Sequence, residues 1–187
     1  MALNESRILR PYIKEKFPRS NIPGKFKIHD SDAEFEYAYV NQHDLKDSPA
    51  ALQAQAEKVR GFYHRRTGTI HLRPSSNLGH ALHEAVHKLA SPAFLNFYGS
   101  FWEEGVAQYF TDCVLVEHGL PRMKSHLYED ELRCAKRLAA FAGPDLLARA
   151  YFVDHGPLLR KLTDRIGGDP STISDLIKQK KLCDRLP

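Results

Sequence analysis

The sequence predicts an α+β fold, with a small twisted sheet early in the chain and a mainly helical half after it. Three observations lead to this prediction. Short strand-like segments separated by turn residues occur in the early part of the chain, whereas apolar residues later recur at spacings of three and four. The 187 residues, 42% of them hydrophobic, suffice for one domain with a proper core but would be cramped as two. We therefore expect one domain over residues 1–187.

The early part of the chain is expected to combine helices with strands. Apolar residues at helical spacing predict a helix over residues 1–17. Strands are expected at 26–29 and at 34–41, the second because aromatic residues alternate along it. Ser48, followed by a proline, predicts the start of a helix over 48–58.

A hairpin is expected next, because two strand-like segments flank a turn that contains glycine. The segments are 59–64 and 69–73, and the turn is 65–68. His64 and His71 lie on this hairpin and, each taken alone, are interpreted as surface histidines.

The central feature of the chain is the segment 78–90, which contains His83-Glu84-Ala85-Val86-His87, an H-E-x-x-H pattern. If the segment is helical, the two histidines lie one turn apart on one face, with Glu84 beside them. Apolar residues form a separate stripe that faces a core. Either of the two serines at 75 and 76 is expected to cap the helix.

These residue types suit a metal site that performs hydrolysis. Two neutral imidazoles suit zinc, and a catalytic zinc takes three protein ligands and a water molecule whose pKa falls to about 7. A carboxylate at the position of Glu84 can accept the proton of that water and pass it to a leaving amine. Iron, cobalt or nickel could take the same donors. The pattern alone is therefore a moderate signal, and a third ligand is needed.

The third ligand is sought downstream, where metzincins carry Gly and His but this chain has Ala90 and Ala93. The segment 101–110 contains Glu-Glu-Gly-Val-Ala, whose Glu-Gly-x-Ala core resembles the ligand helix of the gluzincins, the thermolysin-like and aminopeptidase-like zinc peptidases. In that resemblance Glu104 is the third ligand. Glu103 is the competitor. Helix geometry favours Glu104, because small and polar residues follow it at spacings of three, four and seven: Ala107, Gln108 and Thr111.

The resemblance covers residues 59–167 and implies a zincin-like fold. In gluzincins a strand before the zinc helix edges the cleft and pairs with substrate, and 69–73 is similar to it in position; the alternative is a hairpin that only packs on the helix. The Ala-Tyr-Phe helix end at 150–152, followed by a short helix at 156–167, resembles a second gluzincin feature. The resemblance implies that one side chain stabilises the oxyanion, ranked in this order: Tyr151, His155 and Tyr109.

Helical periodicity also predicts the remaining elements of the second half. An aromatic connector at 94–98 and the single tryptophan, Trp102, are expected to pack in the core. Helices are expected at 100–118, 128–141 and 171–182. The three cysteines are odd in number and far apart, which implies no disulfide framework: Cys113 is interpreted as a core residue, and the roles of Cys134 and Cys183 stay open.

Composition bears on partners and location. The net charge is +4, but lysine and arginine are scattered rather than clustered, which disfavours nucleic-acid binding. No apolar run reaches the roughly 18 residues of a membrane span, and the start has no secretory apolar region. We expect a protein that is cytoplasmic as synthesised, with no signal peptide, transmembrane segment or membrane partner.

The resemblance implies a zinc-dependent peptidase with His83, His87 and Glu104 as ligands of Zn²⁺ and Glu84 as general base. Its partner would be a peptide or protein substrate. Three other interpretations stay open: a catalytically inert zinc-stabilised binding module, a toxin-like effector protease delivered by a specialised secretion system, and an intracellular housekeeping protease. An inhibitor or immunity protein would fit the effector.

Overall fold

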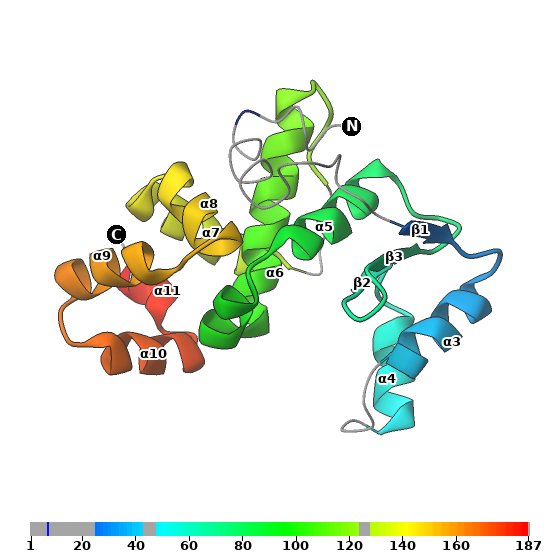
Figure 1. Ribbon diagram of the computed structural model, residues 1–187, viewed down its shortest axis with the longest axis horizontal. Coiled ribbons are helices and arrows are strands. Elements are labelled where there is room, and N and C mark those ends of the chain that lie inside the picture. The colour runs from blue at the N-terminus through cyan, green and yellow to red at the C-terminus, as the bar shows by residue number, and fades with distance from the viewer. Residues whose placement is uncertain (1–6, 8–24, 43–47, 124–127, 187) are drawn as a thin grey trace. The chain divides into compact units, whose positions relative to one another are not determined.

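The computed structural model describes Arg7 and residues 25–42, 48–123 and 128–186, and it is an α+β fold (Figure 1). Helices predominate among these residues, and the strands form one small sheet near the N-terminus. The helix expected over residues 1–17 lies outside the described residues, apart from Arg7.

The described residues group into two compact units. Those of Pro23–Lys88 form one unit, which holds the sheet, and those of Leu89–Pro187, together with Arg7, form the other, which is helical. The single domain expected over 1–187 stays a prediction.

The sheet has three strands in the order β1-β3-β2. Strand β1 (Lys25–Ile28) pairs in parallel with β3 (Thr69–Leu72), and β2 (Gly61–His64) pairs with β3 in antiparallel fashion. The hairpin and the first strand are therefore confirmed. The expectation of an edge strand at 69–73 is wrong. Strand β3 is the central strand and is hydrogen-bonded on both sides, because β1, which lies about 40 residues earlier in the chain, pairs with its other edge.

Residues 34–41 form part of a helix, α3 (Asp32–Gln42), and not the expected strand. Of the aromatic residues, only Phe35 and Tyr39, four positions apart, are buried, while Tyr37 is 74% exposed. The buried spacing is therefore that of a helix. Ser31 caps the start, since its Oγ accepts a hydrogen bond from the backbone N of Glu34 at 3.2 Å.

Helix α4 (Pro49–Ala56) confirms the helix expected at 48–58, and the Ser48 side chain accepts from the backbone N of Ala51 as its cap. Two helices and the sheet share a core in which Phe35 and Tyr39 contact Phe62 of β2.

The buried guanidinium of Arg73 supports this core. It forms ion pairs with Asp32 and Glu36 at 2.8 and 2.7 Å, and its Nε donates to the backbone O of Val59 at 2.8 Å. These carboxylates keep the guanidinium charged despite burial, and its pKa is raised. Arg73 thus joins the end of β3 to α3 and to the residues after α4.

Helix α5 (Leu78–Leu89) confirms the helix expected over the H-E-x-x-H segment. Its cap differs from the expectation of Ser75 or Ser76. The Oδ1 of Asn77 accepts from the backbone N of His80, and the backbone N of Asn77 donates to His80 Nδ1, each at 3.1 Å. Ser76 instead donates its hydroxyl to the backbone O of Arg60.

The helical unit begins with α6 (Pro92–Glu117), which bends at Gly99, a residue in the left-handed region with φ of 76°. The segment 94–98, expected as a connector, is therefore the first part of this helix, with Phe94 and Tyr98 buried as expected. Three further helices agree closely with expectation: α7 (Glu129–Ala142), α8 (Pro144–Phe152) and α9 (Gly156–Ile166). The helix expected at 171–182 forms as α10 (Pro170–Lys178) but ends earlier, and the short α11 (Leu182–Arg185) follows it.

Gly105 permits a close approach of α6 to α7. A Cβ atom there would lie 2.2 Å from the backbone O of Glu131, well inside van der Waals contact. Gly105 was expected to let its helix approach the zinc helix, and the described contact gives it a packing role against α7 within the helical unit.

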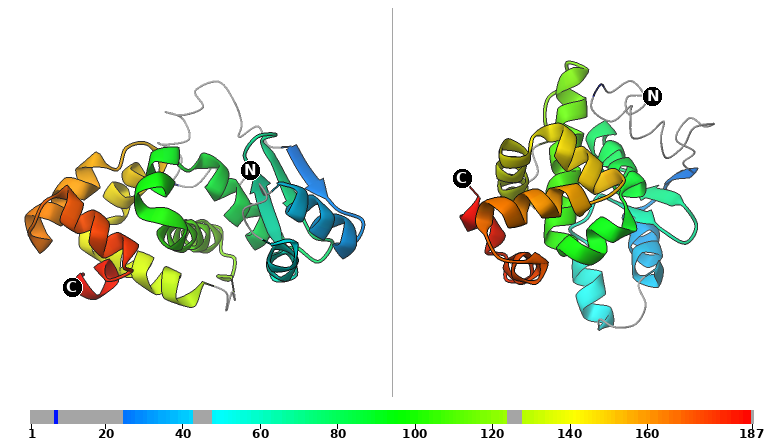
Figure 2. Two further views of the ribbon diagram at one scale, coloured as in Figure 1. Left: turned by 90° about the horizontal axis from the view of Figure 1, so that it is seen from below. Right: turned by 60° about the vertical axis from the view of Figure 1, so that its left-hand side comes forward.

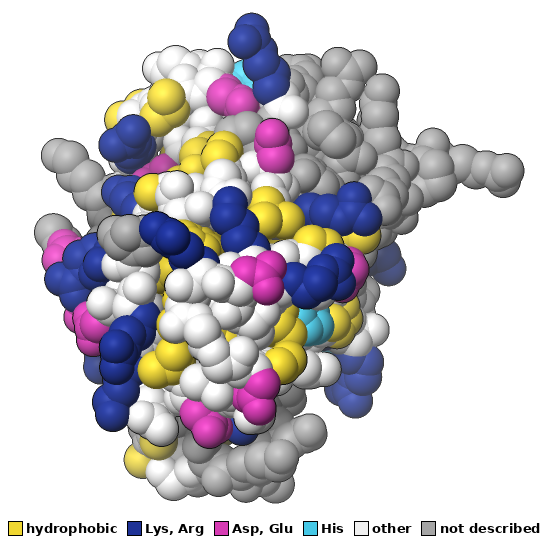
Figure 3. Space-filling model, turned by 90° about the vertical axis from the view of Figure 1, so that its left-hand side faces the viewer, with side chains coloured by type: hydrophobic (Ala, Val, Ile, Leu, Met, Phe, Trp, Pro, Cys, Tyr) yellow, Lys and Arg dark blue, Asp and Glu magenta, His cyan; other side chains and the backbone are white. Residues whose placement is uncertain are grey.

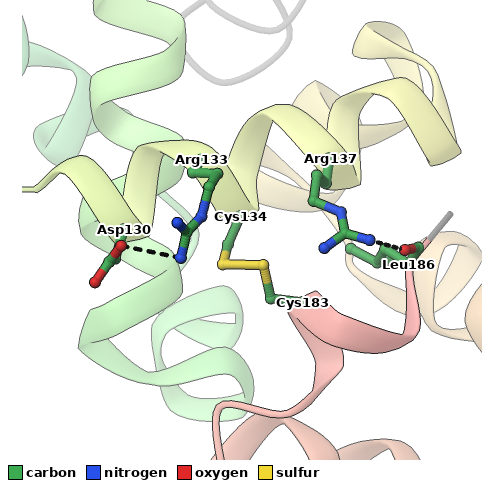
Figure 4. The surroundings of a disulfide bond; sticks show 6 residues. All are labelled: Asp130, Arg133, Cys134, Arg137, Cys183 and Leu186. Atoms are coloured by element: carbon green, nitrogen blue, oxygen red, sulfur yellow. Dashed lines mark hydrogen bonds and ion pairs between the residues drawn. A yellow bond between two sulfur atoms is a disulfide. The ribbon is translucent and has the colours of Figure 1, made fainter.

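A disulfide joins Cys134 of α7 to Cys183 of α11, closing a loop with a sequence separation of 49 (Figure 4). This corrects the expectation that no disulfide is implied, because helix packing brings two distant cysteines to a Cα–Cα distance of 5.2 Å. Cys113 is free and half-buried.

Lysine and arginine side chains are interspersed with acidic ones on the face drawn in Figure 3. No helix of the described residues combines the length and apolar character that crossing a bilayer requires.

Candidate metal centre

Helix α5 brings two imidazoles together. His83 and His87 lie one turn apart, are both buried, and have their Nε2 atoms 2.9 Å from each other. Their rings meet edge to face at a centroid distance of 4.5 Å. On the apolar stripe that the periodicity predicts, four residues are buried: Leu82, Ala85, Val86 and Leu89. Leu78, which was expected on the same stripe, is exposed at the start of the helix. The helix thus turns two potential metal-ligating nitrogens toward one point.

Glu84, between the two histidines, is also buried. Its Cγ lies against β2, because a Cβ atom added to Gly61 would come within 3.0 Å of it. The same added atom would lie 2.9 Å from Leu72 Cδ2 and 3.2 Å from the backbone O of His71. Glycine at this position therefore leaves the room that the Glu84 side chain occupies. No role at the site was predicted for Gly61, for which the signal in the sequence is a glycine inside a strand-like segment.

A third side chain completes a group that could hold a metal ion. His83, His87 and Glu104 each offer one ligand atom, and these atoms all lie within 4.8 Å of one another. The group contains the glutamate that the helix-facing argument favours. Its competitor, Glu103, is buried instead beneath the hydroxyl of Tyr151, which donates a long hydrogen bond of 3.5 Å to Glu103 Oε1.

The residues that follow Glu104 on α6 form a buried polar strip, as predicted. Thr111 Oγ1 donates to the backbone O of Ala107 at 2.8 Å, and Gln108 Nε2 donates to Asp112 Oδ1 at 3.0 Å. Asp112 also accepts from the backbone N of Met123 at 3.3 Å. The sequence analysis missed Asp112, although it lies four positions after Gln108, the spacing at which helix side chains meet.

The two catalytic candidates beyond the metal group occupy different surroundings. Tyr151 is fully buried and packs edge-on against Phe94 and Phe152. His155, half-buried, stacks on Phe97 at a centroid distance of 4.9 Å, and its Nδ1 is buried. The roles of Tyr151 and His155 in stabilising an oxyanion stay predictions.

Tyr109 and Trp102 have packing roles. Burial, together with Cys113 one turn later, raises the pKa of the Tyr109 phenol to about 12. Trp102 is fully buried in the helical unit, which confirms the expectation that it packs in the core.

His71 of β3 and His29, which directly follows β1, contact each other. His71 was expected to be a surface histidine, and no role was predicted for His29. His29 Nε2 and His71 Nδ1 lie 2.9 Å apart, and Phe62 stacks on His71 at a centroid distance of 4.5 Å. Burial, together with the charges of His29 and His64, lowers the pKa of His71 to about 4; burial also lowers the pKa of His29. The pair is therefore neutral near neutral pH, with one imidazole donating to the other.

Comparisons with protein-family models, with curated proteins and with solved structures found no match to this chain.

Proposed function

We propose that this protein is a zinc-dependent peptidase with a zincin-like fold of the gluzincin type. The observation that carries the proposal is the group formed by His83, His87 and Glu104, whose ligand atoms lie within 4.8 Å of one another. The general-base candidate, Glu84, adjoins the first of these residues in sequence and is buried with the histidines.

The donor set fits zinc. Two imidazole nitrogens and one carboxylate oxygen are the ligands of a known class of catalytic zinc site, and three protein ligands leave a position for solvent. Metals that prefer oxygen, such as calcium and magnesium, would take more carboxylates and carbonyls. When bound, zinc would supply a Lewis acid that polarises the scissile carbonyl and acidifies a water molecule.

Glu84 is the residue that moves protons. It is not one of the three grouped ligands, and in this proposal its carboxylate takes a proton from the attacking water and returns it to the leaving amine. Gly61 leaves space for this side chain beside β2. A site that only held a metal for stability would not need a carboxylate at this position.

Tyr151 and His155 are the candidates for stabilising the negative charge that develops on the carbonyl oxygen. The hydroxyl of Tyr151 is engaged with Glu103, and its side chain is fully buried. His155 is half-buried, and its buried Nδ1 has no hydrogen-bond partner among the residues that the structure describes. A ring nitrogen of His155 therefore has hydrogen-bonding capacity that a carbonyl oxygen could use. The variant His155→Gln should be tested beside Tyr151→Phe.

The decisive experiment combines elemental analysis of the purified protein with peptide-library profiling, with and without a chelator. We expect stoichiometric zinc, and hydrolysis that chelation abolishes and added zinc restores. Glu84→Gln should keep the metal and lose turnover on the order of a thousandfold, because only the proton acceptor changes. Zinc without any hydrolysis by the wild-type protein would instead support a zinc-stabilised binding module. Absence of metal binding would refute both.

A further inference from the structure

Strand β1 forms one outer edge of the sheet. In the order β1-β3-β2 it pairs only with β3 among the described residues, and it appears in blue beside the other strands in Figure 2. All four of its residues are exposed, and its two apolar side chains are exposed to 55% at Phe26 and 66% at Ile28. An open edge with exposed apolar side chains is a template for strand addition.

The backbone of β1 has an inward and an outward set of polar groups. The backbone N of His29 donates to the backbone O of Leu72 at 3.0 Å, so His29 faces β3. Because hydrogen-bonding direction alternates along a strand, Lys27 also faces β3, whereas Phe26 and Ile28 direct their N–H and C=O groups outward. These two residues would bond to an added strand.

The side chains of β1 also divide into two kinds. Phe26 and Ile28 are paired in register with the buried Ile70 and Leu72, so they extend that apolar face beyond the core. Lys25 and Lys27 project from the opposite face, where Lys27 forms an exposed ion pair of 3.1 Å with Glu34. The edge therefore presents alternating apolar and basic side chains.

We propose that the outer edge of β1 binds an extended segment of a protein partner in which acidic and apolar residues alternate. Residues on one face of the added strand would lie beside Phe26 and Ile28, and the carboxylates on its other face would lie beside Lys25 and Lys27. A second copy of β1 fits less well, because it would set lysine against lysine or against an apolar side chain and brings no carboxylate.

The bound segment would not contact the strand that lies against Glu84. Strand β3 separates β1 from β2, and it is Gly61 of β2 that lies against Glu84. The edge of β1 is thus a recognition surface distinct from the proposed proton-transfer residue, and the inference does not depend on the proposed peptidase activity.

The test uses the full-length protein and a fluorescent peptide in which glutamate and valine alternate, with anisotropy as the readout. Control peptides carry lysine in place of glutamate, or the same residues in two blocks. We expect saturable binding of the alternating glutamate peptide alone. Binding of the lysine peptide with equal affinity, or no binding of any peptide, would overturn the proposal.

Variants locate the surface. Phe26→Pro removes an outward N–H while leaving the bonds to β3, and should weaken binding on the order of tenfold. Lys25→Glu combined with Lys27→Glu should weaken the glutamate peptide by a similar factor and strengthen the lysine peptide. Tyr37→Ser, on exposed α3, is the matched control and should change nothing. If Phe26→Pro does not fold, the charge reversal decides: an unchanged preference for glutamate would refute the assignment.

Discussion

Glu103 and Glu104 are adjacent in sequence but differ in surroundings. Glu104 belongs to the ligand group with His83 and His87, whereas Glu103 is buried and accepts from Tyr151. Successive helix positions are about 100° apart around the axis, so two neighbours cannot serve the same site equally. The two residues are of the same type, so the side of the helix on which each carboxylate lies determines its role.

This difference leads to a prediction for zinc affinity. Glu104→Ala should lower the zinc affinity on the order of a hundredfold or more, because it removes one of three ligands. Glu103→Ala should leave metal content near that of the wild type and lower thermal stability, because it removes the acceptor of a buried hydroxyl. Competition with a chromophoric chelator measures the affinities. The reverse ranking would exchange the assignments of the two glutamates.

Gly61 has a more indirect role at the residue scale. A methyl group there would meet Glu84 Cγ at 3.0 Å and Leu72 Cδ2 at 2.9 Å, so Gly61→Ala should displace the carboxylate by a few tenths of an ångström. If Glu84 is the general base, kcat should fall on the order of tenfold with zinc content unchanged. Steady-state kinetics and elemental analysis check this. Unaltered kcat in a folded variant would count against Gly61 as a positioning residue.

At the scale of elements, the approach of α6 to α7 depends on a missing side chain. A Cβ at position 105 would lie 2.2 Å from a backbone oxygen and 2.5 Å from the backbone carbon of Glu131. Backbone atoms cannot rotate aside as a side chain can, so the helices would have to separate.

Gly105→Ala should therefore destabilise the protein by about 2–3 kcal/mol despite the better helix propensity of alanine. Gly156→Ala on α9 is the matched control, because the nearest atom there is the flexible Asp154 carboxylate at 3.2 Å. Denaturant unfolding followed by circular dichroism gives both values. Equal stabilities of the two variants would show that α6 and α7 tolerate the methyl group.

Helix α3 also illustrates how local patterns compete. Residues 34–41 alternate aromatic and other side chains, which predicts a strand, but Ser31 caps a helix there and Phe35 and Tyr39 enter the core. Capping and the four-residue spacing together outweigh the alternation. The sequence contained this second signal, since Ser31 and Glu34 stand at the spacing of a capping box.

At the scale of the molecule, the Cys134–Cys183 disulfide stabilises the helical unit by linking α7 to the C-terminal α11. Replacing both cysteines by serine should lower the stability by about 2–4 kcal/mol, mainly because the unfolded chain gains conformational freedom. Cys113→Ser is the control for loss of a thiol. Thermal unfolding of the oxidised protein should respond to dithiothreitol in the wild type but not in the double variant; an equal response would contradict the cross-link.

The stability of the unit that contains the sheet should depend on pH through His29 and His71. Both pKa values are lowered by burial, that of His71 from 6.5 to about 4, so the unfolded chain binds protons more readily than the folded one. This contribution is fully present above pH 6.5 and is lost as the pH falls toward about 4. His71→Gln should flatten the curve of unfolding midpoint against pH in that window. An unchanged slope would contradict this origin.

The sequence by itself determined the features that depend on local spacing. The period of the apolar residues placed α5 and most helices of the second half, the turn chemistry located the hairpin, and H-E-x-x-H put His83 and His87 on one side of one helix turn. These features need only the geometry of one element, which neighbouring residues define.

Only the tertiary structure decided which distant residues meet. Strand β1 pairs with β3, so β3 does not have the expected free edge. Cys134 is bonded to Cys183, and Gly61 lies against Glu84. Each of these depends on how elements pack, and packing is a property of matching surfaces that no periodicity within a single segment encodes.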